Sequence, residues 1–231
     1  CCSLHERKIP SVILSGNHDS QRFWGSMQRV LSLASVHVFD KPSLDRQQVQ
    51  LNIKGQKVCL SILPYPSERI LASLAKNTGT LAEQRLSYAD RVERILIHLA
   101  EKIPEEQVNI LCSHLMVDGA KTSSERELSI SLAFAVKPQS FPHAFDYVAL
   151  GHIHKHQQMK LSPVQTWYSG SPYQIDFGET ETEKGVILID AEPGKTPQPT
   201  FIPLKLKQPL QNVYFHEDQL EPIQQQYQDY P

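Results

Sequence analysis

The sequence predicts an α/β fold, and three observations lead to that prediction. The short apolar run PSVILSG (10–16) reads as a buried strand. Residues 20–35, which follow it, carry apolar side chains at helical spacing, namely Phe23, Met27, Val30 and Leu31. Further apolar runs, rich in Val and Ile, lie on both sides of a long amphipathic segment. A chain in which strands and helices alternate in this way is typical of the α/β class.

The remaining elements follow from the same patterns. Residues 81–103 predict a helix that Pro104 ends, because apolar side chains recur along one face at Ala89, Val92, Leu96, Leu99 and Ile103. The segment 118–131 is polar and predicts a surface loop. Strands are expected at VHVF (36–39), QVQLNI (48–53), KVCLSILPY (57–65), VNILCSH (108–114), DYVALGHIH (146–154), GVILIDA (185–191) and TFIPLKL (200–206), with a turn at KGQ (54–56).

Composition limits the function classes. The chain has 231 residues, 40% of them hydrophobic and 21% charged, which suits one globular domain over residues 1–204. The Pro- and Gln-rich residues 205–231 predict a linker. A net charge of -2 offers no basic excess, so any DNA binding has to be local. The absence of a bilayer-length apolar run and of a signal-peptide pattern in this sequence leads us to expect a cytoplasmic protein without membrane contact.

Three of the predicted strands end in side chains that can bind a metal. The first is followed by Asn17, His18 and Asp19, another ends at His114, and a third ends at His152 and His154. Ligands of α/β sheets bind beyond the carboxyl ends of the strands, so these endings can converge on one crevice. In an extended chain His152 and His154 would point to the same side, and Gly16 and Gly151 would permit close backbone approach. The pattern predicts a shared metal centre.

Each of these residues also has an ordinary structural interpretation. Asp19 or Ser20 could cap the helix that follows. A single histidine at a strand end, such as His114, is more often hydrogen-bonded than metal-bound. The run HIHKH (152–156) could be a solvated edge, and His156 is its weakest ligand candidate because it lies farthest from the strand end. The prediction of a metal centre depends on the joint occurrence of the three endings.

The motifs resemble those of the calcineurin-like metallophosphoesterase superfamily. GNHD (16–19), a strand-end histidine (His114) and GHIH (151–154) match three of its motifs in order. Within that superfamily, SHLMVDGAKTSSERE (113–127), FDYVALGHIHKHQ (145–157) and YSGSPYQIDFGE (168–179) are similar to the SbcD-type nuclease subunits. The resemblance implies an αββα sandwich with a two-sheet core. It also implies a C-terminal capping domain that would begin within 205–231.

The resemblance further implies a role for each site residue. Two divalent ions, Mn²⁺ or alternatively Mg²⁺, would lie between the sheets. Asn17, His114 and His152 would ligate one ion and His154 the other. His18 would stabilise the transition state or protonate the leaving oxygen, and Asp19 would orient it. Two such ions can activate a bridging water and stabilise both oxygens of a phosphodiester displacement.

The sequence departs from the superfamily in one respect. It contains neither the D-x-H nor the G-D-x-x-D motif. In the superfamily these motifs supply further ligands of the ion that His154 would bind, and the carboxylate that bridges the two ions. We therefore expect a chain truncated at the N-terminus that retains half a site and has weak or no activity by itself.

The resemblance leaves three functions to distinguish. The first is a 3′–5′ exonuclease and hairpin endonuclease that acts on DNA as a homodimer with an SbcC-type SMC-like ATPase. The second is another phosphatase or phosphodiesterase of the superfamily. The third is a non-catalytic scaffold, which the missing motifs favour and the retained His18, His152 and His154 oppose.

Overall fold

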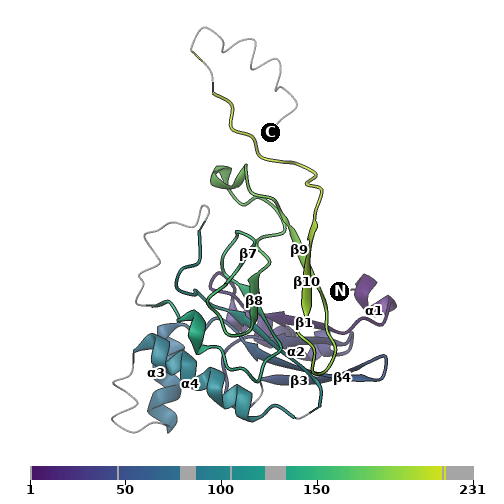
Figure 1. The fold of residues 1–231 in the computed structure, drawn as a ribbon, viewed down its shortest axis with the longest axis vertical. Helices are drawn as coiled ribbons and strands as arrows, with labels where there is room; N and C mark the ends of the chain where they lie inside the picture. The colour runs from purple at the N-terminus through teal and green to yellow at the C-terminus, as the bar shows by residue number, and fades with distance from the viewer. Residues whose placement is uncertain are drawn as a thin grey trace.

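The computed structural model describes residues 2–45, 47–78, 87–104, 106–122, 134–214 and 216. Its strands form a two-stranded sheet, a six-stranded sheet and a separate two-stranded hairpin, with helices packed against them (Figure 1). The α/β prediction is confirmed. The first six residues of the helix predicted over 81–103, most of the loop predicted over 118–131 and most of the linker 205–231 lie outside the described residues.

The six-stranded sheet provides the frame of the molecule. Its order is β3 (Gln48–Ile53), β4 (Gln56–Leu63), β5 (Val108–His114), β6 (Tyr147–Gly151), β8 (Gln165–Tyr168) and β7 (Gln157–Gln158). Strands β4, β5, β6 and β8 run parallel, whereas β3 and β7 pair antiparallel at the two sides. The carboxyl ends of the four parallel strands therefore meet at one edge of the sheet.

Helix α4 (Tyr88–Glu101) covers this sheet with an apolar face. It begins at a capping box, in which Ser87 and Asp90 bond to each other's backbone N–H groups. Helix α3 (Glu68–Thr78) packs beside it and is absent from the elements predicted from the sequence. Together they bury a core with the strands: Leu63, Leu71, Val92, Ile95, Leu96, Leu99, Leu111, Val148, Leu150 and Tyr168.

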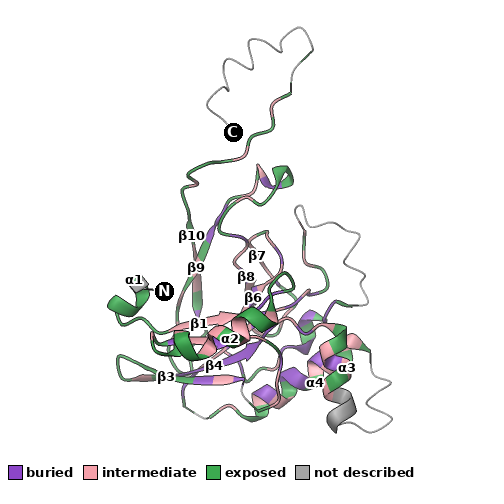
Figure 2. Ribbon diagram, turned by 180° about the vertical axis from the view of Figure 1, so that it is seen from behind, coloured by how far each residue is buried: buried purple, intermediate pink, exposed green. Residues whose placement is uncertain are grey.

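The two-stranded sheet pairs β1 (Ser11–Leu14) with β2 (Val36–Phe39) in parallel, and helices α1 (Cys2–Glu6) and α2 (Gln21–Ser32) flank β1 in sequence. The strand and the helix were both predicted, but the prediction that the strand is buried was wrong. The residues of β1 are half-buried rather than buried, because the described residues pair β1 with β2 alone. Phe23 and Val30 of α2 are 55% and 59% exposed, on a helix that Figure 2 shows at the surface over β1.

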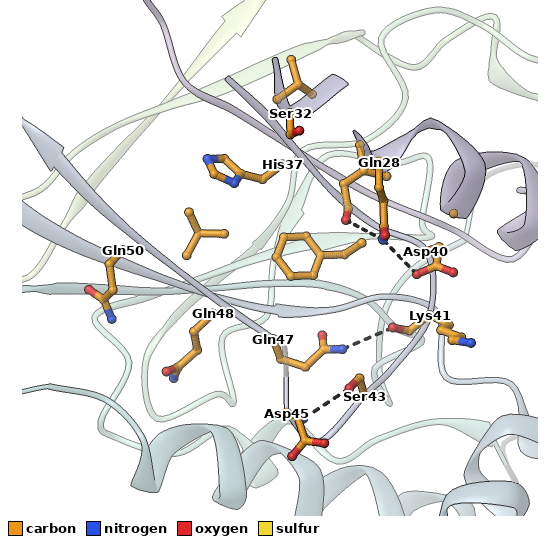
Figure 3. Close-up of a pocket in the computed structure, with 15 residues that line it drawn as sticks. Gln28, Ser32, His37, Asp40, Lys41, Ser43, Asp45, Gln47, Gln48 and Gln50 are labelled. Atoms are coloured by element: carbon orange, nitrogen blue, oxygen red, sulfur yellow. Dashed lines mark hydrogen bonds between the residues drawn. The ribbon is translucent and has the colours of Figure 1, made fainter. Parts of the chain in front are cut away.

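Two further features complete the described fold. The hairpin β9 (Gly185–Asp190) and β10 (Gln198–Pro203) confirms the last two predicted strands, and the short 3₁₀ helices η4 (Pro138–Ser140) and η5 (Phe177–Glu179) lie in loops. A cleft of about 830 Å³ separates α2 and β2 from β3 (Figure 3). Gln47 donates to the Lys41 carbonyl inside it, and none of the strand-end candidates lines it. In the described part of the chain, no helix has the length and apolarity that a membrane crossing requires.

Candidate metal centre

Three of the predicted ligands converge at the carboxyl ends of β1, β5 and β6. The Asn17 side-chain oxygen Oδ1 lies 2.8 Å from Nε2 of His114 and 3.4 Å from Nδ1 of His152. The two imidazole rings are 5.2 Å apart between centroids and nearly perpendicular. We call Asn17, His114 and His152 the strand-end trio. The fold therefore brings together side chains that are up to 135 residues apart in the sequence.

Backbone contacts between the two sheets place these strand ends beside one another. The backbone N–H of Tyr65, just after β4, donates to the carbonyl of Ser15 at 3.0 Å, and Ser15 in turn donates its N–H to Phe39 at 3.0 Å. The end of β1 is thus tied both to its own partner β2 and to the edge of the six-stranded sheet. The loop that carries Asn17 starts from this fixed point.

Two glycines make room for the His114 ring. A Cβ atom at Gly16 would lie 2.6 Å from Cε1 and 2.9 Å from Nε2 of His114, and one at Gly151 would lie 3.0 Å from Nδ1. Contacts under 3.0 Å are not tolerated by real side chains, so the ring can occupy its place only because residue 16 is glycine. The close approach predicted for Gly16 and Gly151 is confirmed, and it explains why a glycine precedes Asn17.

The environment of His114 keeps its imidazole neutral. Burial, and after it the neighbouring His152, lower the pKa of His114 to about 3; Asp19 opposes this shift, and His18 and His154 add smaller contributions in the lowering direction. All four predicted partners are thus close enough to His114 to act on it electrostatically. A neutral imidazole is the form that binds a metal ion.

The trio fits one side of a metal site. Neighbouring ligands of an octahedral ion with bonds of about 2.1 Å are about 3 Å apart, and the two distances from Asn17 Oδ1, 2.8 and 3.4 Å, bracket that value. An amide oxygen with two imidazoles is a donor set for a borderline to hard divalent ion. Over the described ranges no three or more His, Cys, Asp or Glu side chains are grouped as a metal site would require, and the trio contains only two side chains of these types beside the amide of Asn17.

The backbone at His152 corrects one step of the prediction. Strand β6 ends at Gly151. His152 has a positive φ of 103°, a backbone conformation that residues other than glycine rarely adopt. The alternation of an extended strand therefore does not apply to His152 and His154, and the prediction that the strand continues to residue 154 was wrong. Strained backbone of this kind often occurs at functional sites.

His154 is placed by contacts different from those of the trio. Its Nδ1 lies 2.8 Å from Oε1 of Glu179, a side chain that is fully buried. The other carboxylate oxygen of Glu179 accepts a bond from Lys184 Nζ at 2.8 Å. Neither Glu179 nor Lys184 was predicted as a site residue, although Glu179 ends the segment YSGSPYQIDFGE (168–179) that belongs to the resemblance.

The segment between β1 and α2 contains the other two predicted residues. Asp19 accepts hydrogen bonds from the Gly16 N–H at 2.7 Å and from Trp24 Nε1 at 3.2 Å. Ser20 is the helix cap, since its side chain accepts from the Phe23 N–H. Asp19 thus closes the loop that carries Asn17 and His18, and its effect on the orientation of His18 stays a prediction.

Two aromatic contacts were missed by the sequence reasoning. The Tyr65 ring stacks on His152 with centroids 6.3 Å apart and meets His114 edge-on at 6.0 Å. Tyr65 ends the predicted strand 57–65, a position shared with the other strand-end candidates, and this was the available signal. His156, by contrast, is half-buried and stacks on Trp167 and on Phe201, which fits its place as the weakest ligand candidate of the run.

Comparison with known proteins identifies relatives of the chain. It is 30% identical over 189 residues to the D subunit of the nuclease SbcCD from Bacillus subtilis, which covers 81% of the chain and 48% of that protein. It is 31% identical over 222 residues to the protein of the same name in Staphylococcus epidermidis, covering 96% of the chain and 55% of that protein. The chain thus spans about half the length of these relatives. No family model matches it.

Proposed function

Since the chain is a relative of the SbcD-type nuclease subunits, we propose that it forms part of a DNA nuclease that hydrolyses phosphodiesters with divalent metal ions. The observation that carries the proposal is the convergence of Asn17 Oδ1, His114 Nε2 and His152 Nδ1 at the ends of three strands. This is a cluster of metal-binding atoms at the edge of the sheet where α/β enzymes bind their ligands.

In this proposal each predicted site residue has its own role. The strand-end trio holds one ion and His154 contributes to the second, with Mn²⁺ preferred over Mg²⁺ because imidazole nitrogen is part of each donor set. When bound, two ions supply a water of lowered pKa and stabilise the charge on the phosphate oxygens. His18 donates a proton to the leaving oxygen, and Asp19 limits where His18 can lie by closing the loop around it.

The finer parts of the proposal concern substrate and partners. We propose 3′–5′ exonuclease and hairpin endonuclease activity on DNA, in the cytoplasm, as a homodimer with an SbcC-type SMC-like ATPase. The names of the relatives, which each describe one subunit of a nuclease called SbcCD, support a partner protein. Because the sequence has no D-x-H or G-D-x-x-D motif, we propose that its own residues provide about half of the ligands and cut DNA weakly or not at all alone.

Cleavage of an end-labelled hairpin duplex with and without Mn²⁺ tests this proposal. We compare the chain, any longer product of the same reading frame, and that longer product with His18→Ala. The matched control is His98→Ala, on the exposed side of α4. We expect Mn²⁺-dependent cleavage by the longer product and by its His98→Ala form, and a loss of 100-fold or more in His18→Ala.

Two other results would each replace the proposal. Hydrolysis of a chromogenic phosphate ester without cleavage of DNA would favour a phosphatase or a different phosphodiesterase of the superfamily. Binding of Mn²⁺ without hydrolysis of either substrate would favour a scaffold.

A further inference from the structure

A buried ion pair lies directly behind His154. The carboxylate of Glu179 and the ammonium of Lys184 are 2.8 Å apart, and both side chains are fully buried. Removing two charges from water has a large free-energy cost, which the attraction between them often does not recover. Stability alone therefore does not explain why this ion pair is present.

The two carboxylate oxygens of Glu179 have different hydrogen-bond partners. Oε2 accepts from Lys184 Nζ at 2.8 Å, from the Ile175 N–H at 3.0 Å and from Ser171 Oγ at 3.5 Å. Oε1 faces Nδ1 of His154 at 2.8 Å. An ionised carboxylate has no proton to donate, so Nδ1 of His154 must carry the proton of this bond. In the neutral imidazole, Nε2 then holds the lone pair.

The backbone of His154 is held by the same group of residues. Its carbonyl accepts from the Ser171 N–H at 3.1 Å and from Lys184 Nζ at 3.3 Å. Gly170, with a φ of 81°, approaches so closely that a Cβ atom there would lie 2.7 Å from the same carbonyl oxygen. Lys184 thus fixes both the carboxylate that bonds the ring and the backbone that carries it.

We propose that Glu179, held in place by Lys184, is a positioning residue that fixes His154 in the Nδ1–H tautomer and presents Nε2 to the metal centre. A carboxylate behind a histidine ligand orients the ring and raises its basicity, and losing such a partner commonly weakens metal binding 10- to 100-fold. The role of His154 as a ligand rests on the proposed function, whereas its tautomer does not.

The alternative is that the ion pair only secures the loop from Ser171 to Glu179. Two double variants separate the possibilities: Glu179→Gln/Lys184→Met keeps an acceptor oxygen for His154, and Glu179→Met/Lys184→Met removes it. Both lose the buried charges and keep unbranched side chains of similar size. Glu192→Gln, in an exposed pair with Lys195, is the control.

Nitrogen-15 correlation spectra of the histidine rings, recorded without metal, provide the first measurement. The His154 signals are assigned by their loss in His154→Gln. We expect the Nδ1–H tautomer in the unsubstituted chain, in Glu192→Gln and in the variant with Gln at 179, and a shift toward Nε2–H in the variant with Met at 179. Titration with Mn²⁺ is the second measurement, with a 10- to 100-fold weaker dissociation constant expected only for the variant with Met at 179.

The outcomes separate this inference from the proposed function. An Nε2–H tautomer of His154 in the unsubstituted chain would overturn the inference without any variant. An unchanged tautomer with Met at 179 would do the same and leave a purely structural ion pair. If the unsubstituted chain binds no Mn²⁺ but shows the expected tautomers, the positioning of His154 stands and the proposed metal function fails.

Discussion

The two halves of the candidate metal centre are built in different ways. In the strand-end trio, Asn17, His114 and His152 contact one another directly, and each comes from the end of a different strand. His154 instead contacts a buried ion pair formed by residues of one later segment. The position of the His114 ring in the first half depends on the space that Gly16 and Gly151 leave for it. The position of His154 in the second half depends on the charges of Glu179 and Lys184. Substitutions should therefore damage the two halves by different mechanisms.

The largest effect is expected from Lys184→Met, which leaves Glu179 buried without its cation. Breaking a buried ion pair from one side costs about 3–5 kcal/mol, because an uncompensated charge stays in the interior. Urea denaturation of the chain with and without the substitution measures this loss. Lys195→Met is the control: its pair with Glu192 is 70% and 57% exposed, and no measurable change is expected there. Equal effects of the two substitutions would show that the Lys184 pair is not buried in solution.

The next largest effect is expected from Gly16→Ala in the first half. The added methyl would lie 2.6 Å from the His114 ring, so the ring or the loop has to move. Overpacking of this kind costs about 1–3 kcal/mol, and the displaced His114 should weaken Mn²⁺ binding at least tenfold. Gly25→Ala in α2 is the matched control, since its added methyl would meet only the end of the Asp40 side chain at 3.0 Å. Thermal unfolding and Mn²⁺ titration give the two readouts, and intact Mn²⁺ binding in Gly16→Ala would argue against the trio.

The same difference decides how much the sequence could predict. Apolar runs that stop at a polar residue mark strand ends, so Asn17 and His114 could be found from local pattern, and parallel strands bring their ends together. His152 was also found, but for a wrong reason, because its positive φ removes it from the strand. Tyr65 occupies a strand end and was overlooked because aromatic contacts do not follow from spacing.

The parts that were missed depend on contacts between distant segments. Glu179 and Lys184 are charged residues in a stretch without periodicity, and only the tertiary fold shows that both are buried behind His154. In α2 the helical spacing was right, but the spacing does not show that Phe23 and Val30 are more than half exposed. Periodicity identifies a helix and not its neighbours: α4 has the same kind of spacing as α2, yet it buries Val92, Ile95, Leu96 and Leu99.

A further effect is expected from pH, and it belongs to the first half. Burial lowers the pKa of His114 from its ordinary value of 6.5 to about 3, so between these values the unfolded chain binds a proton that the folded chain does not. The contribution of His114 to stability is therefore complete above pH 6.5 and is lost as the pH falls toward 3. The slope it adds is at most about 1.4 kcal/mol per pH unit.

Urea denaturation at pH 7, 6, 5 and 4 measures this dependence, with His114→Asn as the comparison. The variant should show a flatter dependence over this range, because its amide does not titrate. An identical slope in both proteins would mean that His114 is protonated as easily in the folded as in the unfolded chain, which contradicts its burial against His152.

The smallest effect is expected from Tyr65→Leu, which tests whether packing alone orders the strand-end trio. The tyrosine ring stacks on His152 and contacts His114 edge-on, whereas leucine keeps apolar bulk and loses the ring face. Aromatic pairs add about 0.5–1.5 kcal/mol beyond buried area, which corresponds to a loss of about 2- to 12-fold in Mn²⁺ affinity. The tautomer of His154 should not change, because it depends on Glu179. A change in both the Mn²⁺ affinity and the tautomer of His154 would mean that the two halves are coupled through the backbone at His152 and do not respond independently.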